Sequence, residues 1–158
     1  MRTLIIASAA AMMLGSAQAA VANDTVKLME DFYKVADARP FNFAYLSEFY
    51  ATDFVDHHPN PAIPSDAPTG VLYQLLADGA PDSFHSIDMI LPSGDDTAIV
   101  VWSYEGTNTD VLFGIPAQYP ALPFAIAGIE VWKSEDGKLT EMWHVEDIAG
   151  LMAQLTGK

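Results

Sequence analysis

Residues 97–105 read Thr-Ala-Ile-Val-Val-Trp-Ser-Tyr-Glu, and every second position in this run is apolar. One set of alternate positions holds Ala98, Val100, Trp102 and Tyr104, whereas the other set ends in Ser103 and Glu105. A period of two is typical of a half-buried β-strand, because successive side chains point to opposite faces of a sheet. The pattern predicts a long strand from Thr97 to Thr109.

The same periodicity continues on both sides of this strand. It predicts a strand from Phe84 to Leu91, which ends at a turn rich in Gly, Pro and Asp (residues 92–96). It also predicts a strand from Phe124 to Ser134, which the Asp136-Gly137 turn joins to a last strand from Lys138 to Asp147. We therefore expect a sheet of antiparallel strands in the second half of the chain.

The first half of the chain has helical periodicity instead. Asn23 or Asp24 can cap a helix that runs to about Ala38, and shorter helices are expected at Phe41–Tyr50 and Gly70–Leu76. A further short helix, Ile148–Leu155, is expected to close the chain. Helices followed by antiparallel strands, with no break in composition, predict one α+β domain.

The N-terminus has the three parts of a secretory signal peptide. Arg2 precedes an apolar run from Thr3 to Gly15, and Ala17-Gln18-Ala19 supplies an Ala-x-Ala cleavage site. The run is shorter than the roughly 20 apolar residues that cross a bilayer. We predict a signal peptide at residues 1–19, a domain at residues 20–158, and a periplasmic or secreted protein.

The charge of the chain argues against several classes of partner. The whole sequence has 7 Lys and Arg against 21 Asp and Glu, and removal of Arg2 with the signal peptide would leave a formal charge of −15. Such a surface repels phosphate backbones and anionic headgroups, so we expect no nucleic-acid partner and no membrane anchor. Cysteine is absent, which excludes disulfides and thiolate chemistry. No phosphate-binding loop or serine elbow motif is present.

Five segments, taken in order, resemble the signatures of the SnoaL-like polyketide cyclases, or ester cyclases, of the NTF2-like superfamily. They are residues 50–57, 113–116, 128–131, 136–143 and 147–155. The resemblance implies a cystatin-like cone, in which N-terminal helices wrap a curved antiparallel sheet around an apolar pocket, and often a homodimer. One departure is the apolar, proline-rich stretch Ala117–Pro123, which stands where members of the family usually have a polar one.

The chemistry that the resemblance implies is cofactor-free aldol ring closure, with Asp147 at the position of the family's acid/base aspartate. A carboxylate at the edge of an apolar cavity suits proton removal next to a carbonyl group, because burial raises its pKa toward the working pH. Asp147 can equally cap the helix that follows it, by accepting a backbone N–H. Both interpretations stay open at the level of sequence.

Histidines supply the second set of candidates. Alternation places His144 on the same face as Met142 and opposite Asp147, although strand ends bulge and twist. His144 is therefore a candidate proton donor, a partner that holds the aspartate, or a surface histidine. In Asp56-His57-His58, adjacent side chains point apart, so we expect at most one histidine, His58 rather than His57, to face the pocket. The alternative for this cluster is a structural turn.

Aromatic residues are candidates for substrate binding as well as for the core. We predict that Trp102, Tyr104 and Phe113, with Tyr33 of the first helix, line the pocket, although alternate aromatic positions on a strand usually fill a sheet interior. The four histidines lack compact zinc-ligand spacing, so we expect no metal.

Two functions of different class follow. One is a cofactor-free cyclase or isomerase that acts on a small apolar carbonyl compound through Asp147 and His144. The other is a non-catalytic protein that binds a small apolar ligand, because one fold hosts both enzymes and binders. A polar dyad inside the cavity would favour the enzyme.

Cleavage after Ala19 predicts that the mature chain begins at Ala20. Edman sequencing of the protein recovered outside the cytoplasm should read Ala-Val-Ala-Asn-Asp. Recovery of an intact chain with Met1 from the cytoplasm alone would contradict export.

Overall fold

A computed structural model describes residues 24–156 of the chain, so the expected signal peptide lies outside the described residues. The α+β class is confirmed: four helices and a five-stranded sheet occur in this part of the chain. The elements are α1 (Asp24–Ala36), α2 (Phe43–Ser47), β1 (Tyr50–Asp56), α3 (Val71–Gly79), β2 (Phe84–Ser93), β3 (Thr97–Asn108), β4 (Leu122–Glu135), β5 (Lys138–Glu146) and α4 (Ile148–Thr156).

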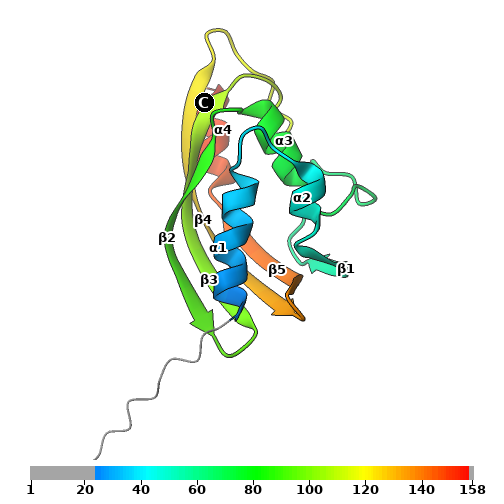
Figure 1. Ribbon diagram of the computed structural model, residues 1–158. Coiled ribbons are helices and arrows are strands. Elements are labelled where there is room, and N and C mark those ends of the chain that lie inside the picture. Colours follow the sequence, from blue (N-terminus) through cyan, green and yellow to red (C-terminus); the bar gives the residue numbers. More distant parts are fainter. Residues whose placement is uncertain (1–23, 157–158) are drawn as a thin grey trace, which may run out of the picture.

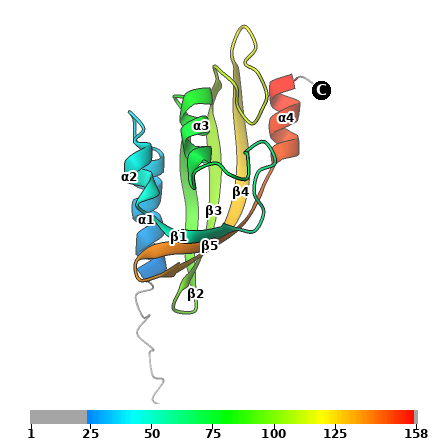
Figure 2. The ribbon, with the colours of Figure 1, turned by 90° about the vertical axis from the view of Figure 1, so that its right-hand side faces the viewer.

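The sheet has the strand order β1-β5-β4-β3-β2 and is strongly curved (Figures 1 and 2). Strands β2 to β5 form an antiparallel meander, as the alternating sequence predicts. The prediction of a wholly antiparallel sheet is wrong in one place, because β1 pairs with β5 in parallel. Parallel pairing is possible here because the long stretch from α3 to β4 separates the two strands in sequence.

Strand β1 is the element that the sequence did not predict. Its residues Tyr50–Asp56 lie at the edge of the sheet, and several of them are exposed, so they lack the regular alternation of a half-buried strand. The register also shifts between Tyr50 and Val55. The expected helix Phe41–Tyr50 is correspondingly reduced to α2, which Asn42 caps through the backbone N–H of Tyr45.

The helices α1, α2 and α3 lie on the concave face of the sheet (Figure 1). The main core forms between them and the inward side chains of β3, β4 and β5, and Phe32 and Trp132 lie fully buried in it. Phe32 contacts five other aromatic rings, with centroid distances between 5.2 and 5.8 Å. Edge-to-face pairs of this kind add to the free energy gained from burial.

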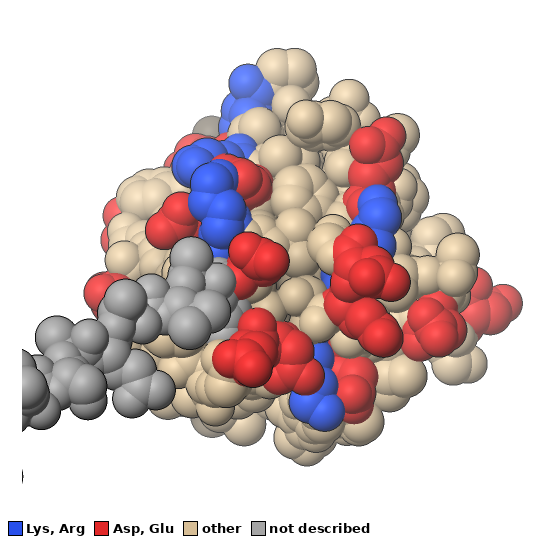
Figure 3. Space-filling view, turned by 60° about the horizontal axis from the view of Figure 1, so that its bottom comes forward, with Lys and Arg blue, Asp and Glu red and all other residues tan. Residues whose placement is uncertain are grey.

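Acidic side chains dominate the end of the molecule at which α1 begins (Figure 3). Basic side chains on this face are few and lie among the acidic ones. No helix within residues 24–156 is long and apolar enough to cross a membrane. A surface of this sign repels anions.

Gly128 of β4 permits close packing against β3. The indole of Trp102 on β3 lies over it, and a Cβ atom at position 128 would overlap three atoms of that ring. The change Gly128→Ala should lower the free energy of unfolding by roughly 1–3 kcal/mol, because the indole has to move within a packed interior. The matched control, Ala127→Val, adds methyl groups on the exposed face next to it and should cost less. Equal melting temperatures for the two variants would contradict this account.

Candidate active site

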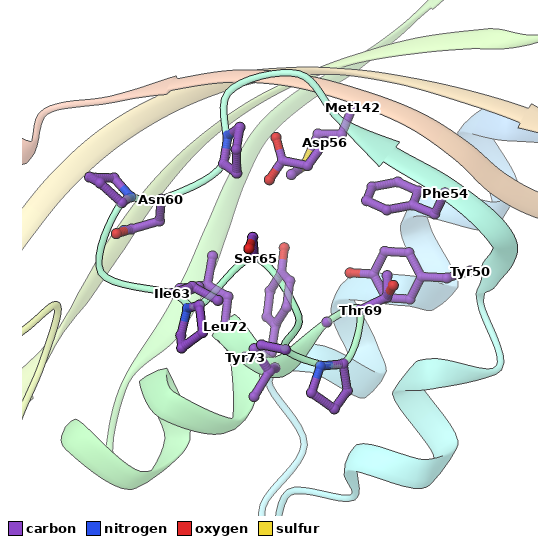
Figure 4. Close-up of a pocket in the computed structure, with 17 residues that line it drawn as sticks. Tyr50, Phe54, Asp56, Asn60, Ile63, Ser65, Thr69, Leu72, Tyr73 and Met142 are labelled. Atoms are coloured by element: carbon purple, nitrogen blue, oxygen red, sulfur yellow. The ribbon is translucent and has the colours of Figure 1, made fainter.

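A cavity of about 390 Å³ opens between the end of the sheet and the helices (Figure 4). Its walls come from β1, from the proline-rich segment 59–70, from the first turn of α3 and from Met142 of β5. The prediction of a pocket bordered by part of Asp56–Asn60 is confirmed. Most of the wall is apolar, with Phe54, Ile63 and Leu72 among its side chains.

Among the described residues that line this cavity, Asp56 is the only one with a charged side chain. It ends β1, and its Oδ1 atom accepts a hydrogen bond from the backbone N–H of His58 at 2.9 Å. Burial raises the pKa of a carboxyl group, but the hydrogen bonds from His144 and from His58 outweigh burial and lower the pKa of Asp56. Asp56 is therefore ionised at neutral pH.

His144 of β5 is the partner of Asp56. Its Nε2 atom lies 3.1 and 3.3 Å from the two carboxylate oxygens of Asp56, and its Nδ1 atom pairs with the carboxylate of Glu146. The imidazole is only 5 % exposed. Burial by itself would lower the pKa of His144, but the two carboxylates outweigh burial and raise the pKa to about 10. The imidazole is therefore a cation fixed between two anions.

Glu130 lies directly opposite His144 in the β4–β5 pair and is only 4 % exposed. Its Oε2 atom accepts hydrogen bonds from the hydroxyl of Tyr33 and, at 2.7 Å, from the indole N–H of Trp132. Burial raises the pKa of Glu130 even though both hydrogen bonds act to lower it. The pKa of Glu130 on β4 is thus raised, whereas the pKa of Asp56 on β1, on the other side of β5, is lowered.

Two phenol groups complete the cavity. The hydroxyls of Tyr50 and Tyr73 point into the same space as the Asp56 carboxylate (Figure 4). Burial, and then the negative charge of Glu130, raise the pKa of both tyrosines well above the usual 10.0. Both phenols therefore stay protonated at neutral pH and can donate hydrogen bonds to a ligand.

Asp147 occupies a different place from these groups. It follows the last residue of β5, is exposed, and accepts a hydrogen bond from the backbone N–H of Gly150 at 2.8 Å. The expected cap of α4 is confirmed by this bond. Asp147 does not line the cavity described above. The prediction that Asp147 borders this pocket is therefore wrong. Its catalytic role stays a prediction.

The two adjacent histidines diverge, as the extended backbone predicts. His57 stacks on Trp143 on the outer face of the sheet, with ring centroids 4.1 Å apart, and its Nε2 atom pairs with Glu141 at 2.8 Å. His58 instead places its Nδ1 atom 3.2 Å from the carbonyl oxygen of His144. Neither is among the residues that line the cavity, so in this structure the cluster orders the end of β1.

The predicted aromatic residues lie elsewhere in the interior. Trp102 and Tyr104 are buried on the concave face of β3, where the Tyr104 hydroxyl donates to Ser83 at 2.6 Å. Phe113 lies in a turn with a positive φ of 50° and packs against the core. Tyr33 binds Glu130, as described above. None of the four lines the 390 Å³ cavity.

The sequence profile of the SnoaL-like polyketide cyclases matches residues 23–155, nearly the whole of the described chain. The chain belongs to the SnoaL-like polyketide cyclase family. A search of curated proteins finds no match.

Solved structures of SnoaL-like and related proteins share this fold. TsrD from Streptomyces laurentii is 23 % identical, with a TM-score of 0.70 over 87 % of this chain and 98 % of its own. IdmH from Streptomyces antibioticus, assigned to the polyketide cyclases, is 22 % identical, with a TM-score of 0.65 over 82 % and 96 %. AclR from Streptomyces galilaeus, assigned as a hydroxylase, is 17 % identical, with a TM-score of 0.70 over 87 % and 99 %. These similarities show that the SnoaL-like chain has the NTF2-like fold.

Sequence reasoning missed three features of this region: the buried Glu130, the Asp56 carboxylate in the cavity wall, and the phenols of Tyr50 and Tyr73. Glu130 was detectable, because it is the one acidic residue on the apolar face of its strand, between Gly128 and Trp132. The pairing of Asp56 with His144 joins residues 88 positions apart and depends on the parallel strand β1. No local pattern reports such a contact.

The His144 pair predicts a pH dependence of stability. The pKa of His144 rises from 6.5 to about 10 on folding, so its stabilising effect is complete below pH 6.5 and is lost as the pH rises toward 10. The melting temperature should fall across this window, whereas in His144→Gln the fall should be reduced. His57→Gln, a matched change at a more exposed histidine, should keep the fall. An imidazole of His144 that titrates below pH 7 by NMR would contradict the proposed pairing.

Proposed function

We propose that this protein is a cofactor-free enzyme of the cyclase type, which acts on a small and mainly apolar carbonyl compound. The observation that carries the proposal is the ionised Asp56 carboxylate in the wall of an apolar cavity, held there by the buried His144 cation. A charged group in an apolar wall costs free energy. A pocket that only binds apolar ligands does not require such a group. Membership of the SnoaL-like family supports the same class of reaction.

In the proposed reaction, Asp56 removes a proton from the carbon next to the ligand's carbonyl group. The electron pair of the C–H bond moves toward the carbonyl oxygen, which becomes an enolate and accepts hydrogen bonds from the phenols of Tyr50 and Tyr73. In ring closure the enolate carbon then attacks a second carbonyl of the same molecule, and the proton on Asp56 passes to the new alkoxide. The lowered pKa of Asp56 keeps it ionised but makes it a weaker base, so the phenols have to supply much of the driving force.

The surroundings of the cavity support an uncharged substrate. Its walls are rich in proline and aliphatic side chains, and Asp56 is the sole formal charge among its described lining residues. The acidic surface of the molecule would repel an anionic substrate (Figure 3). A cavity of about 390 Å³ fits a molecule of two or three fused rings.

A binding protein without catalytic activity is the second candidate. The observation in its favour is Asp147, whose carboxylate bonds to the backbone of α4 and is exposed. In a protein that only binds its ligand, the aspartate at this family position would keep a structural role, as a helix cap, and no catalytic role. The two candidates differ in one respect that can be measured, which is whether the bound ketone exchanges its acidic protons.

Export is part of the proposal. It rests on the Arg2 start, the apolar run and the Ala17-Gln18-Ala19 site, all of which lie outside the described residues. An enzyme outside the cytoplasm that needs no nucleotide or redox cofactor would not depend on cofactors made in the cytoplasm.

Exchange of hydrogen for deuterium tests proton removal without knowledge of the natural substrate. The wild-type protein in D₂O should accelerate deuterium incorporation next to the carbonyl of 2-tetralone and related bicyclic ketones, measured by mass spectrometry. Asp56→Asn should lower this rate on the order of a hundred- to ten-thousand-fold, because the amide cannot act as a base. Asp147→Asn is the matched control and should keep both rate and melting temperature, because asparagine also caps helices.

The opposite result has a clear meaning. If Asp147→Asn loses exchange while Asp56→Asn keeps it, the base is Asp147 and not Asp56. If 2-tetralone quenches the tryptophan fluorescence of the wild type but gains deuterium no faster than in buffer, the protein is a binder.

A further inference from the structure

A second cavity, an open groove of about 560 Å³, lies between α1 and β2. Its lining residues on α1 include Val26, Glu30, Tyr33 and Asp37, which are spaced by four, three and four positions and so share one face of the helix and its C-terminal end. The opposite wall is a strip of β2 formed by His85, Ile87, Met89 and Ile90. No residue lines both this groove and the first cavity.

One end of the groove holds a buried pair of ionisable groups, Asp37 and His85. The Oδ1 atom of Asp37 lies 2.8 Å from Nδ1 of His85, and its Oδ2 atom accepts the backbone N–H of the same residue at 2.9 Å. The His85 side chain is 5 % exposed, and that of Asp37 is 19 % exposed. Two bonds to one residue fix both the position of the carboxylate and the orientation of the imidazole.

The Asp37 carboxylate also fixes the tautomer of His85. A carboxylate only accepts hydrogen bonds, so Nδ1 carries the proton, and Nε2 of the neutral ring is a hydrogen-bond acceptor. Nε2 has no hydrogen-bond partner among residues 24–156, although the side chain is more than nine-tenths buried. The ring lines the groove, so a donor that enters the groove, either water or a ligand, can complete the hydrogen bonding of Nε2.

Aromatic rings enclose the imidazole on several sides. Tyr104 lies 4.5 Å from it between ring centroids, Tyr33 and Trp102 lie at 5.2 Å, and Tyr73 at 6.1 Å. The hydroxyls of Tyr104 and Tyr33 are already bonded to Ser83 and Glu130. These phenols are therefore committed elsewhere and do not supply the missing donor.

We propose that the groove between α1 and β2 is a second small-molecule site, which takes an uncharged apolar compound that carries a hydroxyl group. The hydroxyl donates its hydrogen to Nε2 of His85, and the apolar body lies along Val26, Ile87, Met89 and Ile90. An anionic head is disfavoured because Asp37 and Glu30 line the same groove, and Lys34 is already paired with Asp31. The site is independent of the proposed reaction in the first cavity.

Paired probes test the hydroxyl requirement. 2-Naphthol and 2-methoxynaphthalene have the same apolar body, but only the first can donate a hydrogen bond. With the full chain carrying ¹⁵N-labelled histidine, 2-naphthol should shift the Nε2 resonance of His85 and should bind about tenfold more tightly than the ether, the factor that one hydrogen bond of ordinary strength supplies.

The affinities of three variants for 2-naphthol show which cavity the probe occupies. His85→Phe keeps an aromatic ring but removes the acceptor, and should lower the affinity for 2-naphthol about tenfold. In Asp37→Asn the amide can donate to Nδ1, which moves the ring proton to Nε2, so the preference for the hydroxyl over the ether should disappear even where the fold is intact. Ser65→Trp, which narrows the first cavity from an exposed position of its rim, should leave the affinity unchanged.

Each opposite outcome overturns the proposal. Equal affinity for the two probes would exclude a hydrogen bond to His85. Unchanged binding to Asp37→Asn and His85→Phe would place the probe outside the groove. Loss of 2-naphthol binding in Ser65→Trp would place it in the first cavity, where it would inform on the proposed reaction instead.

Discussion

The hydrogen bonds of Glu130 and His144 are the constraint on which the interior depends, because both side chains are charged or polar groups on the concave, buried face of the sheet. An unpaired charge in such a place costs several kcal/mol. Tyr33 and Trp132 supply donors to Glu130, while Asp56 and Glu146 neutralise His144. Two of these hydrogen bonds also hold elements together: Tyr33 fixes α1 against β4, and Asp56 fixes the end of β1 against β5.

The curvature of the sheet brings the Asp56–His144 contact to the wall of the first cavity. Strand β1 reaches β5 only because the sheet bends far enough for its edge to lie below α3 and the proline-rich segment (Figure 2). The edge strand thereby brings Tyr50 and Asp56 to one wall of the cavity, and α3 brings Tyr73 to the facing wall. An ionised carboxylate and two hydrogen-bond donors thus converge from two elements, β1 and α3, and neither element contains the whole set.

Glu130 also interacts with residues of both cavities. Its partner Tyr33 lines the groove between α1 and β2, and its charge raises the pKa of Tyr50 and Tyr73 in the first cavity. The aromatic wall between the cavities is closely packed, and Trp102 lies against the bare backbone of Gly128. Interiors of this density transmit small displacements. The histidines of two Asp–His pairs, Asp56–His144 and Asp37–His85, both act electrostatically on this one buried acid.

The sequence by itself determined the class of the fold, the antiparallel meander of β2 to β5 and the face on which His144 lies, and it offered the helix cap at Asp147 as one of two interpretations. These features depend on periodicity and on neighbours a few positions apart, which a single sequence displays. Only the tertiary structure decided the parallel strand β1, the Asp56–His144 pair and the groove around His85. The two Asp–His pairs among them join residues 48 and 88 positions apart. Their energy comes from burial and from hydrogen bonds between distant segments, so no local pattern contains it.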